Sequence, residues 1–213
     1  MTEKTLILFT GPSTVGKTAF VEMLRKIDPN LYPMPQVSCR QPRADDDPAL
    51  IRVYPDRDVF ERQSFWIRHK DYGLLEDDLV AFLASDKPMA IGMVGIHELQ
   101  EAKDKKQTDV AVKTVLVRFA KDPQEEVKIV EENIKNFFAK PKVRLEQNRR
   151  HLEEFFLNDT FIKKYVDLVL YREDALQDRF HIFGEVFNHP LAERVSAQGV
   201  EKVFSELQGR KKQ

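Results

Sequence analysis

An eight-residue stretch near the start of the chain has the residue types and spacing of a phosphate-binding loop. It reads "GPSTVGKT", from Gly11 to Thr18, and it matches the pattern G-x-x-x-x-G-K-[ST] at every fixed position. The apolar run "TLILFT" precedes it, and a helical pattern begins at Lys17. A strand, a glycine-bearing loop and a helix form the context in which this pattern binds a nucleoside triphosphate.

The chemistry of this loop follows from its residue types. Glycine at both ends allows backbone turns that a side chain would block, so that successive N–H groups can surround an anion. The N-terminus of the following helix adds positive partial charge. Lys17 can reach the outer phosphates of ATP, and the hydroxyl of Thr18 can ligate Mg²⁺. The residues expected to hold the ATP phosphates are Gly11, Ser13, Thr14, Val15, Gly16, Lys17 and Thr18.

Two sequence features separate the classes of protein that share such a loop. A GTPase would carry a base-reading N-K-x-D run, and this sequence has none. A motor or transport ATPase would carry a strand that ends in an acidic, metal-orienting residue, whereas the strand-like run "MAIGMVG" (Met89–Gly95) ends without one. The remaining large class consists of kinases that act on small substrates, and this is the class we expect.

A second anion site is indicated by the run "VSCRQPR", residues 37–43. Arg40 and Arg43 flank Pro42, whose ring stiffens the chain between them. Two guanidinium groups placed in this way could clamp a phosphate, because arginine binds phosphate in a fork-like geometry. The alternative is two solvated surface arginines, since most arginines in proteins are exposed.

With these two motifs the sequence resembles the guanylate kinase family. That family has a G-P-S-G-V-G-K-[ST] loop and an S-x-T-T-R-x-P-R segment, which here are "GPSTVGKT" and the shorter match "VSCRQPR". It also has S-R-E-E-F at the start of a helix and a Y-Y-G turn, which are matched by "DRDVF" and "DYG". The four motifs follow in the same order over about the first half of the chain, and the rest agrees only in the order of strands and helices.

The resemblance implies roles for individual residues. Arg40 and Arg43 would hold the phosphate of the acceptor, and Tyr72 would hydrogen-bond the same phosphate. Arg144 would be a lid arginine that contacts the transferred phosphoryl group. The candidate catalytic residues are therefore Lys17, Arg40 and Arg144.

The resemblance also implies a fold. It would be an α/β, P-loop NTPase-type three-layer sandwich with a parallel core sheet. A subdomain that binds the acceptor would be inserted at about 36–74, and a helical lid would lie at about 138–150. The whole chain would then be a single kinase domain that uses ATP and Mg²⁺.

The sequence departs from the family where the family reads guanine. The hydroxyl position falls near Gln36, the glutamate position near Gln63 and the aspartate position at Val94. A buried donor that lacks its acceptor costs about 1–3 kcal/mol, so the missing carboxylates argue against GMP as the acceptor. Arg52 stands where the family has a tyrosine on the acceptor phosphate, and it adds a cation to the site unless it faces solvent.

A basic segment in the second half of the chain could close over the phosphates. On a helix that begins at Val143, four polar side chains share one face through their spacing. They are Arg144, Gln147, Asn148 and His151. Phosphoryl transfer needs positioning and charge neutralisation, which such a face supplies; the alternative is a solvated basic helix. His97, at the end of a core strand, is assigned a structural role.

The pattern of apolar residues predicts alternating strands and helices. Buried strands are expected at 5–10, 89–95, 113–120 and 166–171. Helices are expected at 17–27, 75–84, 97–105, 123–138, 143–157 and 191–207. Near-continuous apolar strands are typical of a parallel sheet that is covered on both faces, and their alternation with helices predicts a doubly wound α/β domain.

The composition favours a soluble protein of the cytoplasm. The chain has 213 residues and a formal net charge of −1, so no overall positive field would draw it to nucleic acid or membrane. Cys39 is the only cysteine, which favours a reducing compartment. No apolar run approaches the length of about 20 residues that a membrane span needs, and "MTEKTLILF" is too acidic for a secretory signal. We expect a monomer or homodimer that binds a nucleotide or a phosphorylated metabolite.

The function expected from the sequence is transfer of the γ-phosphoryl group of MgATP to a nucleoside monophosphate-like acceptor. A kinase of the same architecture that acts on a sugar phosphate or another small metabolite is the first alternative, which the missing guanine-reading acids favour. A non-catalytic guanylate kinase-like binding module is the second. Such modules usually have degraded phosphate loops, whereas the loop of this chain is intact.

Overall fold

A parallel sheet of five strands forms the centre of the molecule. The structure is a computed structural model, which describes residues 4–44, 46–105, 109–138, 141–172, 183 and 187. The strand order is β2-β7-β1-β8-β9, and every neighbouring pair is parallel. The strands are β1 (Lys4–Thr10), β2 (Tyr32–Met34), β7 (Met89–Met93), β8 (Val110–Arg118) and β9 (Leu168–Tyr171).

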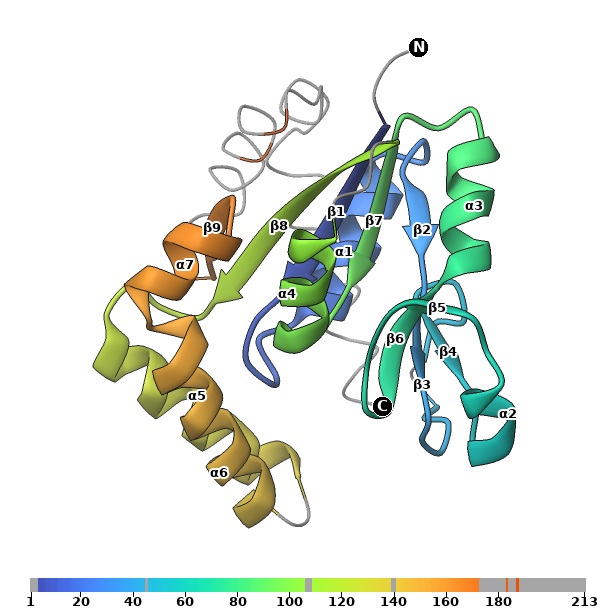
Figure 1. The fold of residues 1–213 in the computed structure, drawn as a ribbon. Helices are drawn as coiled ribbons and strands as arrows, with labels where there is room; N and C mark the ends of the chain where they lie inside the picture. The colour runs from blue at the N-terminus through green and yellow to red at the C-terminus, as the bar shows by residue number, and fades with distance from the viewer. Residues whose placement is uncertain are drawn as a thin grey trace.

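The central strand β1 is apolar on both faces because helices cover both faces of the sheet. Its residues from Leu6 to Phe9 are fully buried. Figure 1 shows α4 (Ile96–Asp104) in front of the sheet and α1 (Lys17–Ile27) behind it. Strand β1 pairs with β7 on one side and with β8 on the other, so that Phe9 lies opposite Met93 and Val115. All five strands therefore end at the same edge of the sheet.

A smaller sheet with the order β4-β3-β6-β5 lies beside this edge (Figure 1). Its own apolar cluster consists of Val37, Phe60 and Leu75. Helix α3 (Glu76–Ala84) leads back from it to the central sheet. Its strands and one short helix are β3 (Gln36–Ser38), β4 (Ile51–Val53), α2 (Arg57–Glu61), β5 (Phe65–His69) and β6 (Tyr72–Leu75).

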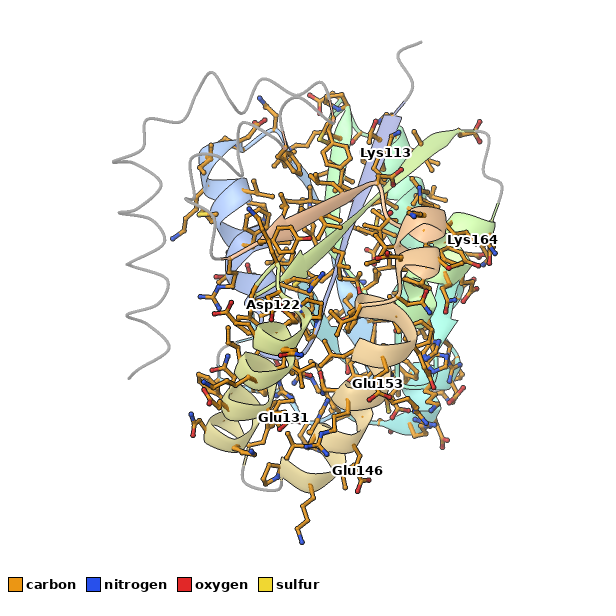
Figure 2. All side chains as sticks on the ribbon, turned by 90° about the vertical axis from the view of Figure 1, so that its left-hand side faces the viewer. Lys113, Asp122, Glu131, Glu146, Glu153 and Lys164 are labelled. Atoms are coloured by element: carbon orange, nitrogen blue, oxygen red, sulfur yellow. The ribbon has the colours of Figure 1, made fainter. Side chains whose placement is uncertain are left out.

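Two helices project from the other side of the same edge. Figure 2 shows α5 (Pro123–Phe137) and α6 (Pro141–His151) side by side. Arg149 of α6 is 2.5 Å from a carboxylate oxygen of Glu131 on α5. A π-helical turn, η1 (Leu152–Phe156), follows α6, and α7 (Asp159–Tyr165) then leads to β9.

The α/β fold predicted from the sequence is confirmed, and its four predicted core strands are present with small shifts of their ends. Outside the inserted segment, strand β2 and helix α7 were not predicted. Strand β2 is only three residues long and contains Pro33, so no periodic pattern marks it, and α7 is only seven residues long. The helix predicted at 191–207 lies outside the described residues. Within those residues, none of the helices has the length and apolar character required to cross a bilayer.

The buried carboxylate of Glu126 joins α5 to the end of β8. Its Oε2 accepts hydrogen bonds from the backbone N–H groups of Phe119 and Ala120, both at 2.7 Å, and the residue is fully buried. We expect Glu126→Ala to lower the free energy of unfolding by about 2–4 kcal/mol, because each buried N–H that loses its acceptor costs about 1–3 kcal/mol. Urea denaturation measures this. The exposed neighbour Glu125→Ala is the control, and an equal effect of both changes would contradict the prediction.

Candidate active site

A cleft of 540 Å³ opens where the strands of the central sheet end. Four parts of the chain line it: the phosphate loop, the end of β7 with the start of α4, the smaller sheet, and helix α6 with η1. The phosphate loop lies on its floor, and the smaller sheet and α6 stand on opposite sides (Figure 1). Segments that are far apart in the sequence therefore meet around one cavity.

Two glycines of the phosphate loop have backbone conformations that other residues avoid. Gly11 has φ 150°, and a Cβ atom there would lie 2.2 Å from the carbonyl oxygen of Val117 on β8. Gly16 has φ 89° and stands directly before α1. Any side chain at Gly11 would collide with the backbone of β8, so only glycine allows the loop to pass this close to β8.

Thr14 adopts a similar conformation without being glycine. Its φ is 67°, in the left-handed region, and it stands where the loop of the resembled family has glycine. A β-branched residue rarely takes this conformation. Its hydroxyl donates to the carbonyl oxygen of Ser13 at 2.5 Å. Because of its positive φ, the loop has a conformation at this position that glycine would adopt with less strain.

The lysine of the loop lies inside it. The Lys17 ammonium donates to the carbonyl oxygens of Gly11 at 2.8 Å and Pro12 at 3.0 Å. Burial lowers the pKa of Lys17 to about 8. Lys17 and Thr18 both line the cleft. A cation, a hydroxyl and a helix N-terminus thus converge at one place, and this set of groups fits a nucleoside triphosphate with its Mg²⁺.

Helix α6 is hydrogen-bonded to the phosphate loop through Asn148. The carboxamide oxygen of Asn148 accepts from the backbone N–H of Ser13 at 3.0 Å. Its nitrogen donates to the Ser13 hydroxyl at 3.2 Å and to the carbonyl oxygen of Arg144 at 2.8 Å. Asn148 is 4% exposed. The uncharged carboxamide oxygen of Asn148 therefore accepts the hydrogen bond of a loop N–H group that would otherwise be free for a phosphate oxygen.

Arg144 lies in the cleft, as the sequence predicted for a residue that faces the phosphates. It lines the cavity together with Gln147 and Arg150. Its guanidinium also lies over the ring of Phe138, 5.4 Å from the ring centroid. The basic face of α6 is thus turned toward the cleft, although the contact of Arg144 with a phosphoryl group stays a prediction.

The carboxylate of Asp46 binds the guanidinium of Arg40 and the backbone N–H of Arg43. Arg40 contacts Asp46 through both terminal nitrogens, at 2.9 and 2.5 Å, and the backbone N–H of Arg43 donates to Asp46 at 2.7 Å. Burial alone would raise the pKa of Asp46, but the hydrogen bonds and charges of the two arginines hold it below its ordinary value. Neither arginine is among the residues that line the cleft.

The other two predicted acceptor residues differ from each other. Tyr72 lines the cleft. Arg52 does not, and its guanidinium makes two hydrogen bonds of 3.1 Å to Asp78 at the start of α3. Of the positions aligned with guanine recognition, Gln36 and Val94 line the cleft, whereas Gln63 donates to the carbonyl oxygen of Val59.

Sequence reasoning missed His69, Arg172 and Glu98 at this site. His69 lines the cleft together with His97, which was assigned a structural role, and with His151, which was predicted on the polar face of the basic helix. Arg172, after β9, donates to the carbonyl oxygen of Val15 at 3.3 Å, and burial lowers its pKa. Glu98 is 3% exposed, lines the cleft, and has its pKa raised by burial to about 7. The one sequence signal near any of the three missed residues was the position of His97, next to Glu98, after a core strand.

The fold is similar to that of a guanylate kinase. The crystal structure of guanylate kinase from Anaplasma phagocytophilum superposes with a TM-score of 0.56 and covers 92% of this chain and 88% of that chain. The two sequences are 12% identical. No protein-family profile matches the chain, and no characterised protein matches it in sequence. The similarity is therefore one of architecture.

The contact of Asn148 with the phosphate loop leads to a prediction about α6. We expect Asn148→Ala to increase amide hydrogen exchange in α6 about 5- to 10-fold, because losing a hydrogen-bonded contact of about 1–1.5 kcal/mol raises the population of opened states. Hydrogen-exchange mass spectrometry of the segment 141–151 measures this. Glu146→Ala, an exposed change on the same helix, is the control. Unchanged exchange in Asn148→Ala would show that the contact does not hold α6.

Proposed function

We propose that the protein is an ATP-dependent phosphotransferase that transfers the γ-phosphoryl group of MgATP to a small phosphorylated acceptor of the nucleoside monophosphate type. One observation carries the proposal. An intact phosphate loop forms the floor of a cleft whose two sides are formed by a separate small sheet and by a basic helix. This arrangement leaves room for a donor on the loop and an acceptor opposite it.

The phosphate loop would bind the donor. Its backbone N–H groups and the N-terminus of α1 would surround the β-phosphate, and Lys17 would turn from the carbonyl oxygens of Gly11 and Pro12 to the outer phosphates. Thr18 would hold the Mg²⁺ ion, which neutralises charge on the phosphates when it is bound. The N–H of Ser13 would exchange the oxygen of Asn148 for one of phosphate.

The transfer itself requires no covalent intermediate with the protein. An oxygen of the acceptor forms a bond to the γ-phosphorus while the bond from that phosphorus to the β,γ-bridging oxygen breaks, and ADP leaves. Negative charge spreads over the transferred group during this exchange. Lys17 and Arg144 would offset that charge, and closure of α6 over the cleft would exclude water from the reacting groups.

The residues aligned with guanine recognition do not favour GMP as the acceptor. The carboxylates that would pair with guanine are absent at Gln36, Gln63 and Val94, which favours an acceptor other than GMP. A sugar phosphate or another phosphorylated metabolite is the second candidate for the same reason. Acceptor binding by Arg40 and Arg43 stays a prediction from the resemblance, and for Arg40 it would require the guanidinium to leave Asp46.

The first test concerns the donor. We expect Lys17→Ala to lower kcat for ATP turnover by about 10²-fold or more, since removal of one preorganised charge at a transferred group has effects of this size. A coupled assay of ADP release measures it, with circular dichroism as a check on folding. Lys26→Ala, an exposed change on α1, is the matched control. Undiminished turnover in Lys17→Ala would contradict the kinase proposal.

The second test concerns the acceptor. ADP release is measured with MgATP across nucleoside monophosphates, deoxynucleoside monophosphates and sugar phosphates. We expect one of these classes to stimulate ADP release at least about tenfold over the hydrolysis seen with MgATP alone, because an enzyme with this cleft orients its acceptor for attack. If no acceptor stimulates turnover while ATP still binds, the non-catalytic binding module becomes the better account.

A further inference from the structure

Three imidazole rings from three different elements meet in the cleft. His69 ends β5 of the smaller sheet, His97 is near the start of α4, and His151 ends α6. The ring of His97 lies between the other two, with its centroid 4.2 Å from that of His69 and 5.8 Å from that of His151. The ring of Phe155 packs against both His97 and His151. The ring of His97 therefore connects the smaller sheet on one side of the cleft with α6 on the other.

The nitrogens of these rings have no hydrogen-bond partner among the described residues. In the described part of the chain the rings contact one another and the rings of Phe155 and Phe156. They do not form a metal site either, because in the part of the chain that the structure describes no group of three histidine, cysteine or acidic residues could hold a metal ion. Polar groups that line a cavity without protein partners are available to a ligand.

The histidines stand beside the phosphate loop. Strands β1 and β7 pair in parallel, with Phe9 opposite Met93. The phosphate loop follows β1 at Gly11, and His97 follows β7 after the same edge of the sheet. Both segments line the cleft. A group bound at His97 would therefore lie next to a triphosphate on the loop, where an acceptor has to be.

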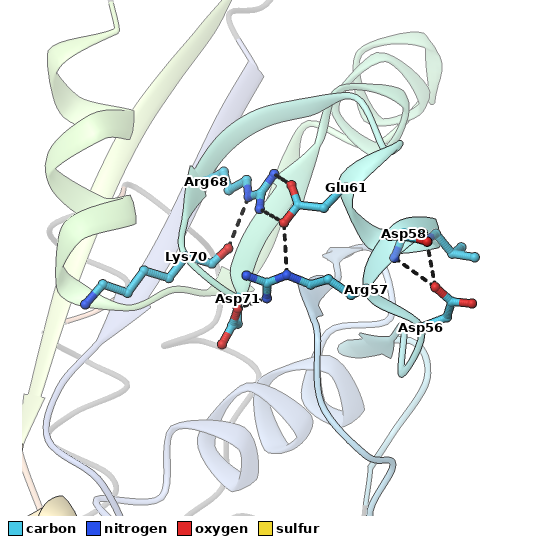
Figure 3. Close-up of polar contacts among 8 residues, drawn as sticks. Asp56, Arg57, Asp58, Glu61, Arg68, Lys70 and Asp71 are labelled. Atoms are coloured by element: carbon cyan, nitrogen blue, oxygen red, sulfur yellow. Dashed lines mark hydrogen bonds and ion pairs between the residues drawn. The ribbon is translucent and has the colours of Figure 1, made fainter.

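Ion pairs connect the hairpin that carries His69 to α2. Arg57 of α2 pairs with both Glu61 and Asp71, and Arg68 pairs with Glu61 at 2.6 Å (Figure 3). In the same view the side chain of Lys70 extends away from this network, and Lys70 lines the cleft. The network thus contacts the turn of the hairpin but does not engage the side chains of Lys70 and His69, which line the cavity.

The charges around the rings favour an anion. Cationic side chains line the cleft from the loop, the hairpin and α6, and they are Lys17, Lys70, Arg144 and Arg150. The acidic groups that face the rings come from the hairpin and α4, and they are Asp71, Glu98 and Glu101. Arg57 already pairs with Asp71, and Lys105 with Glu101 at 3.2 Å. The guanidinium groups of Arg40 and Arg52 are bound by carboxylates outside the lining of the cleft.

We propose that His69, His97 and His151 together bind the anionic group of the phosphoryl acceptor, a phosphate monoester or similar dianion, in place of an arginine clamp. The proposal rests on the proposed function, since it names the acceptor half of the same cleft. A dianion among imidazoles favours their protonated forms. Binding therefore takes up protons from solution, and the site is cationic mainly when it is filled.

The pKa values of the histidines without ligand determine how anion affinity changes with pH. Burial, and then the charge of His97, lower the pKa of His69, and the same causes lower that of His151 to about 4. These two rings are thus neutral at pH 7 without ligand. A bound dianion raises their pKa values, so affinity is highest at low pH. Affinity falls as pH rises through the pKa values of the filled site, by at most about tenfold per pH unit for each proton taken up.

The test uses sulfate as the probe, because sulfate stays a dianion from pH 5 to pH 8 whereas a phosphate monoester loses its second proton near pH 6. Lys17→Ala serves as the background, so that the phosphate loop does not dominate the signal. Imidazole resonances are followed by NMR during sulfate titrations at several pH values. We expect sulfate to raise the pKa values of His69 and His151 and to bind at least tenfold more weakly at pH 8 than at pH 5.5.

Variants in the same background decide which groups bind the anion. His97→Gln and, as a second variant in case the first fails to fold, His69→Gln should weaken sulfate binding at pH 6 at least tenfold. Arg40→Gln and the exposed Lys163→Gln should change it less than twofold. Loss of binding in Arg40→Gln with no change in the histidine variants would overturn the proposal in favour of the arginine clamp.

Two further outcomes separate this proposal from the proposed function. If sulfate does not bind the Lys17→Ala protein while the unaltered protein phosphorylates an acceptor, the histidine site is wrong and the kinase stands. If sulfate binds with the expected pH dependence while no acceptor supports ATP turnover, the anion site stands and the kinase is wrong.

Discussion

The pairing of β1 with β7 and β8 determines where every group of the cleft stands. Gly11 leaves β1 so close to β8 that a Cβ atom would lie 2.2 Å from a backbone oxygen, which fixes the path of the phosphate loop. On the other side, the parallel register with β7 places the start of α4 next to that loop. The smaller sheet and α6 then add groups to a floor whose geometry comes from main-chain hydrogen bonds. Because those bonds are buried in the sheet, the floor does not depend on surface interactions.

Charged groups at the periphery of the cleft differ from those that line it. Arginines on its periphery are paired with carboxylates, as Arg40 is with Asp46 and Arg52 with Asp78. The groups that line it include Lys17, whose pKa is lowered to about 8, and Glu98, whose pKa is raised to about 7. Groups with shifted pKa values cluster at functional sites because burial and function both place charge in confined cavities. The charge of the cleft can thus respond to what it binds.

The sequence alone was sufficient for those features that depend on neighbouring residues. The phosphate loop is a contiguous motif, and apolar runs such as "TLILFT" mark the core strands, so both could be predicted. Strand β2 could not, because three residues with a proline carry no period. The pairing of Arg40 with Asp46 could not be distinguished from binding of an external phosphate, since both use the same guanidinium. The meeting of His69, His97 and His151 depends on the packing of three elements, which no spacing in the sequence records.

The π-helical turn at Leu152–Phe156 sets the rotational phase of the helix before it. An ordinary helix advances about 100° per residue, so one residue more or less in this turn would rotate α6 by that angle relative to α7. Asn148 would then leave Ser13, and His151 would leave His97, in a single step and without any change in residue type. The number of residues in this one turn therefore determines which face of α6 contacts the phosphate loop.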